Sequence, residues 1–328
     1  MKKRVLIALM AFLLCISLAA CGGSASAADF PTKPVTLIVP YGAGGTSDVN
    51  ARIMSLYFPK YFNNQPLIVL NQPGGATTIG LNELVNSPAD GYTIGWLSIP
   101  GITQPLINFT DYDYLEDLDH ITQHNYKPQG LYAKTDSRFK TLQDVVDYAK
   151  ENPGTLTYGH SSEGGPTHLM VEIFCDIAGI EMIAIPFDGT SAVITAFLGG
   201  HIDFGAGALG DIVGYIDSGE ASMLVVAQDK REPGQYSEIP TFRELGYEVI
   251  MPMWDGISVP KGTPPEVQKI LSEGMRNILT DPEFVAQMEE LFVTPFWTTP
   301  EGFYNSMRAQ TEVMRPILEA LKIGARNQ

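Results

Sequence analysis

The chain has 328 residues, of which 45% are hydrophobic and 18% charged, a composition typical of a folded protein of about two domains. Its 37 acidic residues outnumber its 21 lysines and arginines, and the formal net charge of −16 excludes a basic nucleic-acid-binding surface. Three cysteines, Cys15, Cys21 and Cys175, are too few for a disulfide framework or a four-cysteine zinc site.

The first twenty residues have the pattern of a bacterial export signal. Three basic residues precede an apolar run that ends at Leu18, which is too short and too close to the start to be a membrane span of the mature protein. The sequence Leu18-Ala-Ala-Cys21 is typical of a lipoprotein cleavage site. We therefore expect removal of residues 1–20 and a lipid on Cys21, with cleavage without lipidation as the alternative. Residues 21–29 would form a flexible tether, which places the protein outside the cytoplasm at a membrane.

From residue 30 onward, short β-rich runs alternate with helical patterns, which predicts two α/β units. In the first unit we expect strands at 35–40, 67–70 and 92–98 and helices at 47–62 and 77–86. In the second we expect strands at 131–134, 156–160, 183–186, 202–206 and 223–227 and helices at 141–151, 166–178, 191–198 and 209–218. Three final helices, without new strands, are expected at 265–279, 282–291 and 300–321.

The chain is expected to cross between the two units near residues 125–130 and 249–257. Residues 30–128 together with 252–328 would then form lobe 1, and residues 129–251 would form lobe 2.

Three loops rich in glycine and hydroxyl residues each follow a predicted strand and precede a predicted helix, at residues 40–48, 159–168 and 187–191. Glycine allows close backbone approach, and a helix N-terminus presents free N–H groups, which suits a carboxylate or a phosphate. The first loop matches neither a P-loop nor a dinucleotide-binding fingerprint. Ligands of open α/β sheets bind at the carboxyl ends of the strands, so we expect one cleft bordered by all three loops. A tight strand-to-helix turn is the alternative reading of each loop.

Chemistry of other kinds has less support in the sequence. Ser161 lies in a near match to a hydrolase nucleophile motif, but Glu163 replaces the closing glycine. A serine hydrolase that uses Ser161 or Ser162 with His168 is therefore only an alternative, and we expect no enzymatic activity. His120 and His124 have metal-ligand spacing without further ligands nearby, so we expect a solvated or structural role for them, no metal and no other cofactor.

Three motifs carry a resemblance to a known family. They are Phe30-Pro-Thr-Lys-Pro-Val-Thr-Leu-Ile-Val-Pro-Tyr-Gly-Ala-Gly-Gly-Thr-Ser-Asp48, Asn71-Gln-Pro-Gly-Gly-Ala76 and Pro260-Lys-Gly-Thr-Pro-Pro265. With them the mature chain resembles the substrate-binding proteins of tripartite tricarboxylate transporters, the Bug family. The resemblance implies an α/β, two-lobed, type II-like periplasmic-binding-protein fold. Each lobe would hold a mixed or mostly parallel sheet flanked by helices, with the ligand cleft between the lobes.

The same resemblance implies a function and a set of site residues. The protein would capture a small carboxylate by lobe closure, as a monomer, and deliver it to the membrane subunits of the transporter; a ligand-sensing receptor for a signalling system is the alternative. In the family, the loops that match Tyr41–Ser47 and His160–Thr167 bind a ligand carboxylate through backbone N–H groups and ordered waters. The implied ligand-binding residues are Tyr41, Ala43, Gly44, Gly45, Thr46, Ser47, Ser98, His160, Ser161, Ser162, Thr167, Asp188 and Ala208.

One position departs from the family. Asp188 lies where relatives often carry lysine or arginine, and Glu163 adds a second negative charge. If these carboxylates face the cleft, they would repel a second ligand carboxylate and tolerate a neutral, hydroxylated or ammonium-bearing end; otherwise they point into solvent.

Overall fold

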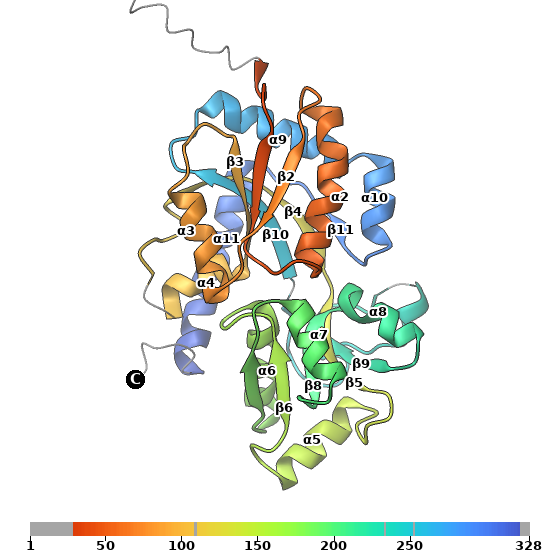
Figure 1. Cartoon of the computed structure of the whole chain (residues 1–328). Coiled ribbons are helices and arrows are strands. Elements are labelled where there is room, and N and C mark those ends of the chain that lie inside the picture. Colours follow the sequence, from red (N-terminus) through yellow and green to blue (C-terminus); the bar gives the residue numbers. More distant parts are fainter. Residues whose placement is uncertain (1–28, 108–109, 233, 252, 322–328) are drawn as a thin grey trace, which may run out of the picture.

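Two β-sheets organise the part of the chain that the computed structural model describes, namely residues 29–107, 110–232, 234–251 and 253–321 (Figure 1). Each sheet is the centre of one lobe, and the two lobes lie one above the other in the view of Figure 1. The expected export signal and Cys21 lie outside the described residues, and so does most of the tether. The described ranges contain no helix of the length and apolar character that a membrane crossing requires.

The upper sheet has six strands in the order β11-β4-β10-β3-β1-β2. The parallel strands are β1 (Val35–Val39), β2 (Leu67–Asn71) and β3 (Thr93–Ser98). The long strand β10 (Met253–Pro260) runs antiparallel to β3 and to β4 (Leu118–Lys127), and the two-residue β11 (Thr294–Pro295) pairs with β4. The sheet is therefore mixed, and β11 corrects the expectation that no strand follows residue 264.

Helices cover both faces of the upper sheet because its first strand is apolar on both sides. Val35, Leu37 and Val39 pack in one cluster with α2 (Thr46–Tyr61) and α9 (Pro265–Leu279). Ile38, which points to the opposite face, packs with Leu81 of α3 (Thr78–Val85). The remaining helices of this lobe are α4 (Ile99–Ile107), α10 (Pro282–Glu289) and α11 (Pro300–Ala320), and a short 3₁₀ turn spans Gly75–Thr77.

The lower sheet has five strands in the order β7-β6-β8-β5-β9. The parallel strands are β6 (Thr157–His160), β7 (Ile183–Pro186) and β8 (Phe204–Ala208), and β5 (Gln129–Lys134) runs antiparallel to β8 and to β9 (Ala221–Val226). Its helices are α5 (Leu142–Glu151), α6 (Pro166–Ala178), α7 (Thr190–Leu198) and α8 (Leu209–Asp217), and a 3₁₀ turn spans Gly234–Tyr236. This sheet is also mixed.

The chain passes between the two lobes at two connections. Strand β4 continues to Lys127 and β5 begins at Gln129, so Pro128 alone separates them. The return connection ends where β10 begins, at Met253. The Gln129 side-chain amide donates to the carbonyl oxygen of Met251 at 2.5 Å and so ties the two connections together. Strand β4 is unusually polar, although most of its residues are buried.

Several elements agree closely with the sequence. The helices at 166–178 and 265–279 and the strand at 183–186 begin and end as expected, and the capping box of Thr141 and Asp144 opens α5. The fourth strand of the second unit is shifted, since it spans 204–208 instead of 202–206. Helix α4 and strand β4 were not predicted at all.

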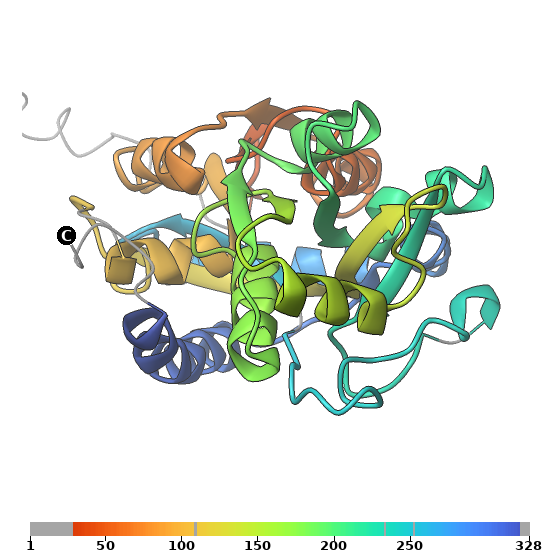
Figure 2. The ribbon, with the colours of Figure 1, turned by 90° about the horizontal axis from the view of Figure 1, so that it is seen from below.

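Seen from below, in Figure 2, α11 runs along one side of the molecule and α7 overlies α2.

Candidate ligand-binding cleft

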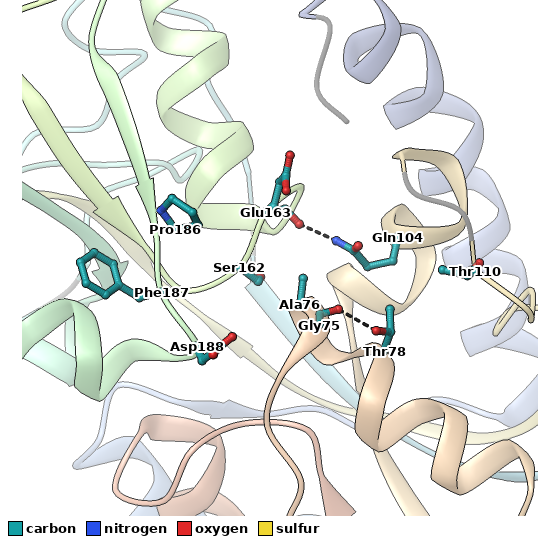
Figure 3. A pocket seen from close by; sticks show the side chains of 10 residues that line it. All are labelled: Gly75, Ala76, Thr78, Gln104, Thr110, Ser162, Glu163, Pro186, Phe187 and Asp188. Atoms are coloured by element: carbon teal, nitrogen blue, oxygen red, sulfur yellow. Dashed lines mark hydrogen bonds between the residues drawn. The ribbon is translucent and has the colours of Figure 1, made fainter. Parts of the chain in front are cut away.

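Three neighbouring cavities lie where the lobes meet. The large cavity, of about 580 Å³, is bordered by Gly75, Ala76, Thr78, Gln104 and Thr110 of the upper lobe and by Ser162, Glu163, Pro186, Phe187 and Asp188 of the lower lobe (Figure 3). The central cavity, of about 30 Å³, is bordered by residues of both lobes that include Tyr41, Ser98, Lys127, Ser161 and Asp255. The α2–α8 cavity, of about 140 Å³, is bordered by Asn50 and Asp211 among others. Both of the smaller cavities are bordered by Gly45, Thr46, Thr190 and Asp211.

Four helices begin at the central cavity. The first turn of each helix contributes at least one residue that borders this cavity. Among these residues are Thr46 of α2, Pro166 of α6, Thr190 of α7 and Asp211 of α8. The N-cap residues of α2, α6 and α7 are glycines that make no side-chain cap. Helix N-termini carry partial positive charge and free N–H groups, although Pro166 lacks one. The central cavity is therefore suited to an anionic group.

The loop before α2 is held by a buried carboxylate. Asp48 Oδ2 accepts hydrogen bonds from the Gly44 N–H at 2.9 Å and from Arg52 Nε at 3.0 Å. Burial alone would raise the pKa of Asp48, but Arg52 and the Gly44 N–H hold it below its usual value. Gly44 has φ of +82°, a conformation that favours glycine. These contacts preorganise the loop, with Asp48 in the first turn of α2.

The loop before α6 is supported by two stacked histidines. The rings of His160 and His168 lie 4.2 Å apart and nearly parallel. His168 Nδ1 accepts from the Gly164 N–H at 3.0 Å, and His160 Nδ1 donates to the Ser162 carbonyl oxygen at 3.0 Å. Burial lowers the pKa of His160 to about 4 and that of His168 to about 3, so both rings are neutral at pH 7. His168 therefore supports the loop structurally, and its Nδ1 lone pair is occupied by the Gly164 N–H.

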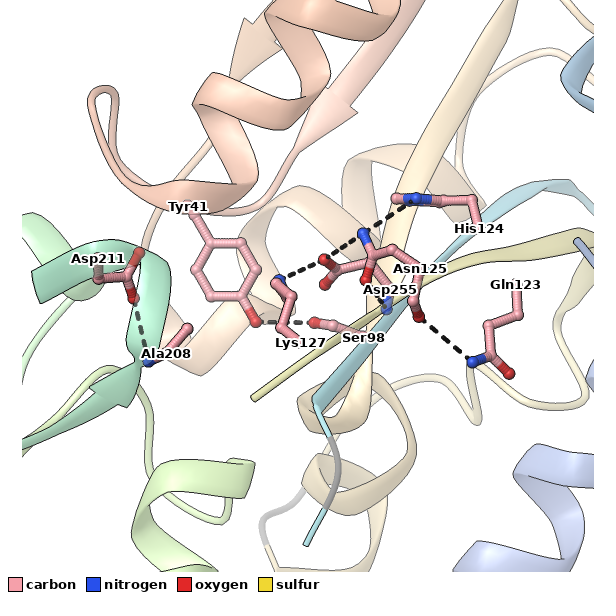
Figure 4. A network of polar contacts seen from close by, with 9 residues as sticks. All are labelled: Tyr41, Ser98, Gln123, His124, Asn125, Lys127, Ala208, Asp211 and Asp255. Atoms are coloured by element: carbon pink, nitrogen blue, oxygen red, sulfur yellow. Dashed lines mark hydrogen bonds and ion pairs between the residues drawn. The ribbon is translucent and has the colours of Figure 1, made fainter. Parts of the chain in front are cut away.

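A polar network forms one wall of the central cavity (Figure 4). The Lys127 ammonium group pairs with Asp255 Oδ2, which also accepts from Asn125 Nδ2 at 3.0 Å. Burial alone would raise the pKa of Asp255, but the charge of Lys127 holds it below its usual value. The hydroxyls of Tyr41 and Ser98 are 2.7 Å apart, and burial raises the pKa of Tyr41, which stays protonated.

The structure brings most of the predicted site residues to this interface. The large cavity is bordered by Ser162 and Asp188, and the α2–α8 cavity is bordered by Gly44. The central cavity is bordered by Tyr41, Gly45, Thr46, Ser47, Ser98 and Ser161. In Figure 3 the Asp188 carboxylate points toward the loop of Gly75 and Ala76.

Four predicted residues border none of the three cavities. Ala43 is exposed, whereas His160, Thr167 and Ala208 are buried. Ala208 ends β8, and its N–H donates to Asp211 Oδ2 at 3.2 Å. His160 supports its loop from behind, as described above.

Sequence reasoning missed several residues at the cleft. Lys127 and Asp255 lie at the predicted crossovers, and only Asp255 stands out there, as a charged residue in a mostly apolar segment. Asp211 and Asn50 look like ordinary polar positions of surface helices. Asn50 is nevertheless fully buried.

The charged residues that border the three cavities are mostly acidic. Lys127 is the one cation among the described lining residues, against the carboxylates of Glu163, Asp188, Asp211 and Asp255. His120 and His124 are buried in β4, and His120 bonds to Ser258 and to the Leu115 carbonyl, which agrees with the structural one of the two expected roles. Among the residues with described positions, no group of three or more potential ligands is arranged to hold a metal ion.

Two α/β lobes with polar, ligand-sized cavities between them define a solute-binding protein of the periplasmic type. The model of the tripartite tricarboxylate transporter family receptor, TctC, matches residues 51–323, and the chain belongs to this family. It is 28% identical over 310 residues to the "UPF0065 protein in gbd 5'region" of Cupriavidus necator, with 93% of each chain covered.

Solved structures agree in fold. The chain is similar to the periplasmic binding protein BugD, with a TM-score of 0.84 and 24% identity, and to Rpa4515 of R. palustris, solved with adipate, with a TM-score of 0.85 and 24% identity. In both cases 90% of this chain and 99% of the other are covered.

Proposed function

We propose that this protein captures a small carboxylate-containing metabolite between its lobes and delivers it to the membrane subunits of a tripartite tricarboxylate-type transporter. The observation that carries the proposal is the convergence of the first turns of α2, α6, α7 and α8, from both lobes, on the central cavity. A carboxylate bound there would interact with both lobes at once, because α2 belongs to the upper lobe and the other three helices to the lower. Family membership and the adipate bound by Rpa4515 are consistent with such a ligand.

Capture would proceed by lobe closure, and direct contacts across the cleft support this. Thr103 Oγ1 of α4 donates to the Gly164 carbonyl oxygen at 2.8 Å, and Gln104 Nε2 donates to the Glu163 carbonyl oxygen at 2.6 Å. A ligand that contacts both lobes favours the closed arrangement by its differential affinity for that state. The two connections beside Gln129 are the places where the backbone would flex.

Membrane attachment through Cys21 completes the proposal. A lipid on this residue would hold the mature protein at the membrane that contains the transporter subunits. Cys21→Ser should abolish the incorporation of labelled fatty acid into the protein without changing the affinity of the folded lobes for ligand. Wild-type protein that takes up no labelled fatty acid would contradict lipid attachment at this position.

The binding step is tested with residues 22–328, the mature protein without its cysteine at position 21, by thermal shift and titration calorimetry. The probes are mono-, di- and tricarboxylates, amino acids and the corresponding uncharged amides. A ligand at 100 times its Kd should stabilise the protein by about 2.7 kcal/mol. Binding confined to carboxylates supports the proposal, and equal binding of the amides contradicts it.

Delivery is tested in cells by deletion of the gene and measurement of labelled-ligand uptake. Loss of uptake that the wild-type gene restores supports transport. Unchanged uptake with loss of a transcriptional response to the ligand would instead identify a sensing receptor.

A further inference from the structure

Asp211 occupies a position between the two smaller cavities that the capture of a simple carboxylate does not explain. It borders both the central and the α2–α8 cavity, in the first turn of α8. One of its carboxylate oxygens accepts the Ala208 N–H at 3.2 Å. We propose that the cleft selects ligands that carry a primary ammonium group beside their carboxylate, and that Asp211, Asn50 and Thr46 hold this ammonium group. This inference rests on the proposed capture of a carboxylate.

The α2–α8 cavity offers unused hydrogen-bond acceptors. Asn50 is fully buried in α2 and borders this cavity, yet neither its amide oxygen nor its amide nitrogen has a partner among the described residues. The hydroxyl of Thr46, one turn earlier, is buried and likewise unpartnered within the described ranges. A buried polar group without a partner is costly, so such groups are typical of a site that a ligand completes.

The acceptors match an ammonium group in number and charge. An ammonium group has three donors and no acceptor. The carboxylate of Asp211, the amide oxygen of Asn50 and the hydroxyl of Thr46 can each accept one hydrogen bond. A second carboxylate in this place would instead face the carboxylate of Asp211.

The charges around the cleft lead to the same ligand class. The one lining cation, Lys127, is paired with Asp255, and Asp211, Glu163 and Asp188 add negative charge. A dicarboxylate would add two more negative charges to this surface. A zwitterion adds none, and it places its carboxylate at the helix N-termini and its ammonium group at Asp211.

The protonation state of Asp211 supplies an independent readout. Burial raises the pKa of Asp211 to about 6, while Lys127 and the Ala208 N–H act in the opposite direction. The other titratable groups that border the central cavity with it are Asp255, which adds to the rise, and Tyr41, which stays protonated. An ammonium ligand requires ionised Asp211, so its affinity should fall as the pH drops below about 6.

The experiment compares amino acids with their desamino analogues on the mature protein by calorimetry. The probes are the common α-amino acids, β-alanine and γ-aminobutyrate, each beside the carboxylic acid that lacks the amino group. We expect at least one amino acid to bind at least about tenfold more tightly than its analogue, the effect of a hydrogen-bonded charged group. A desamino acid that binds as well as or better than every amino acid overturns the inference but leaves carboxylate capture standing. Binding of no carboxylate at all overturns both.

Variants separate recognition of the ammonium group from general damage. Asp211→Asn should weaken the amino acid at least about tenfold, leave the desamino analogue unchanged or tighter, and remove the fall in affinity below pH 6. Asp176→Asn is the matched control, because Asp176 is an exposed residue near the far end of α6. Equal weakening of both ligands in Asp211→Asn would overturn the assignment. Asn50→Leu, similar in size, should show the same preference for the desamino analogue, and its thermal unfolding reports whether it folds.

Discussion

Lys127 of β4 and Asp255 of β10 form an ion pair that is shielded from solvent, with 2% and 3% of the two side chains exposed. Asp255 keeps a hydrogen bond from Asn125, but Lys127 is its cationic partner. Removal of one member of a buried pair leaves the other charge desolvated and uncompensated. Lys127→Met should therefore lower the free energy of unfolding of the ligand-free protein by about 3 kcal/mol, measured by urea denaturation.

The control for this change is an exposed ion pair. Lys269 and Glu273 are four residues apart on α9, with 74% and 65% of their side chains exposed. Lys269→Met should change the stability by less than about 0.5 kcal/mol, since solvent screens such pairs. Equal effects of the two substitutions would show that the burial of the Lys127 pair has no energetic consequence.

The hydrogen bond from Thr103 to Gly164 crosses the cleft, so its loss should affect binding more than folding. Thr103→Val keeps the shape of the side chain and removes the donor. The closed state should lose about 0.5–1.5 kcal/mol, which corresponds to roughly two- to tenfold weaker ligand binding. Thr311→Val is the matched control, because the Thr311 hydroxyl bonds to Met307 within α11. Calorimetric affinities that change equally in both variants would argue against a role for the Thr103 bond in closure.

Gly45 lies at the point where α2 approaches α7 of the other lobe. A Cβ atom there would lie 4.0 Å from Thr190 Cβ, so the methyl groups of valine would enter the space between the lobes. Gly45→Val should weaken ligand binding at least about tenfold by overpacking while the lobes stay folded. Gly44→Val is a poorer test, because φ of +82° strains any side chain at that position.

Gly214 provides the control for the Gly45 substitution. A Cβ at Gly214, in α8, meets nothing within 4 Å. Gly214→Val should leave the affinity unchanged in calorimetry. Near-wild-type affinity of Gly45→Val would refute the placement of the closed interface at this glycine.

The buried histidines should make the protein sensitive to acid. Burial lowers the pKa of His120 and of His124 to about 4. In the unfolded chain a histidine takes up its proton near pH 6.5, so acidification favours the unfolded state. The stability that neutral His120 contributes is complete above about pH 6.5 and is lost as the pH falls toward 4.

His120→Gln tests this pH dependence. Glutamine offers a donor and an acceptor but does not titrate, so the loss of stability between pH 6.5 and pH 4 should be smaller by about 3 kcal/mol in this variant. Urea denaturation at several pH values measures the difference. His201→Gln, at an exposed position, is the control. A pH profile in His120→Gln that matches the wild type would contradict the burial of a neutral imidazole.

Local sequence patterns predicted the elements whose signals lie within a few residues. Helix α6 follows a glycine-rich loop and ends directly before Gly179, and α9 begins at Pro265, so both have clear start or stop signals. The loops of Tyr41–Ser47 and Ser161–Ser162 were found because glycine and hydroxyl residues between a strand and a helix form a continuous pattern. Strand β4 was missed because its polar residues are buried by neighbours distant in the sequence.

By itself, the sequence determined the two-lobed α/β class, the family and the loops of the cleft, because these depend on hydrophobic periodicity, turn chemistry and contiguous motifs. Only the tertiary structure decided which charges meet inside the cleft. Lys127 and Asp255 are 128 residues apart, and strand pairing between β4 and β10 makes them partners. Asn50 and Asp211 come from different lobes and border one cavity. A pattern within a short window carries no information about such encounters, because the burial and pairing of a polar group depend on the whole chain having folded.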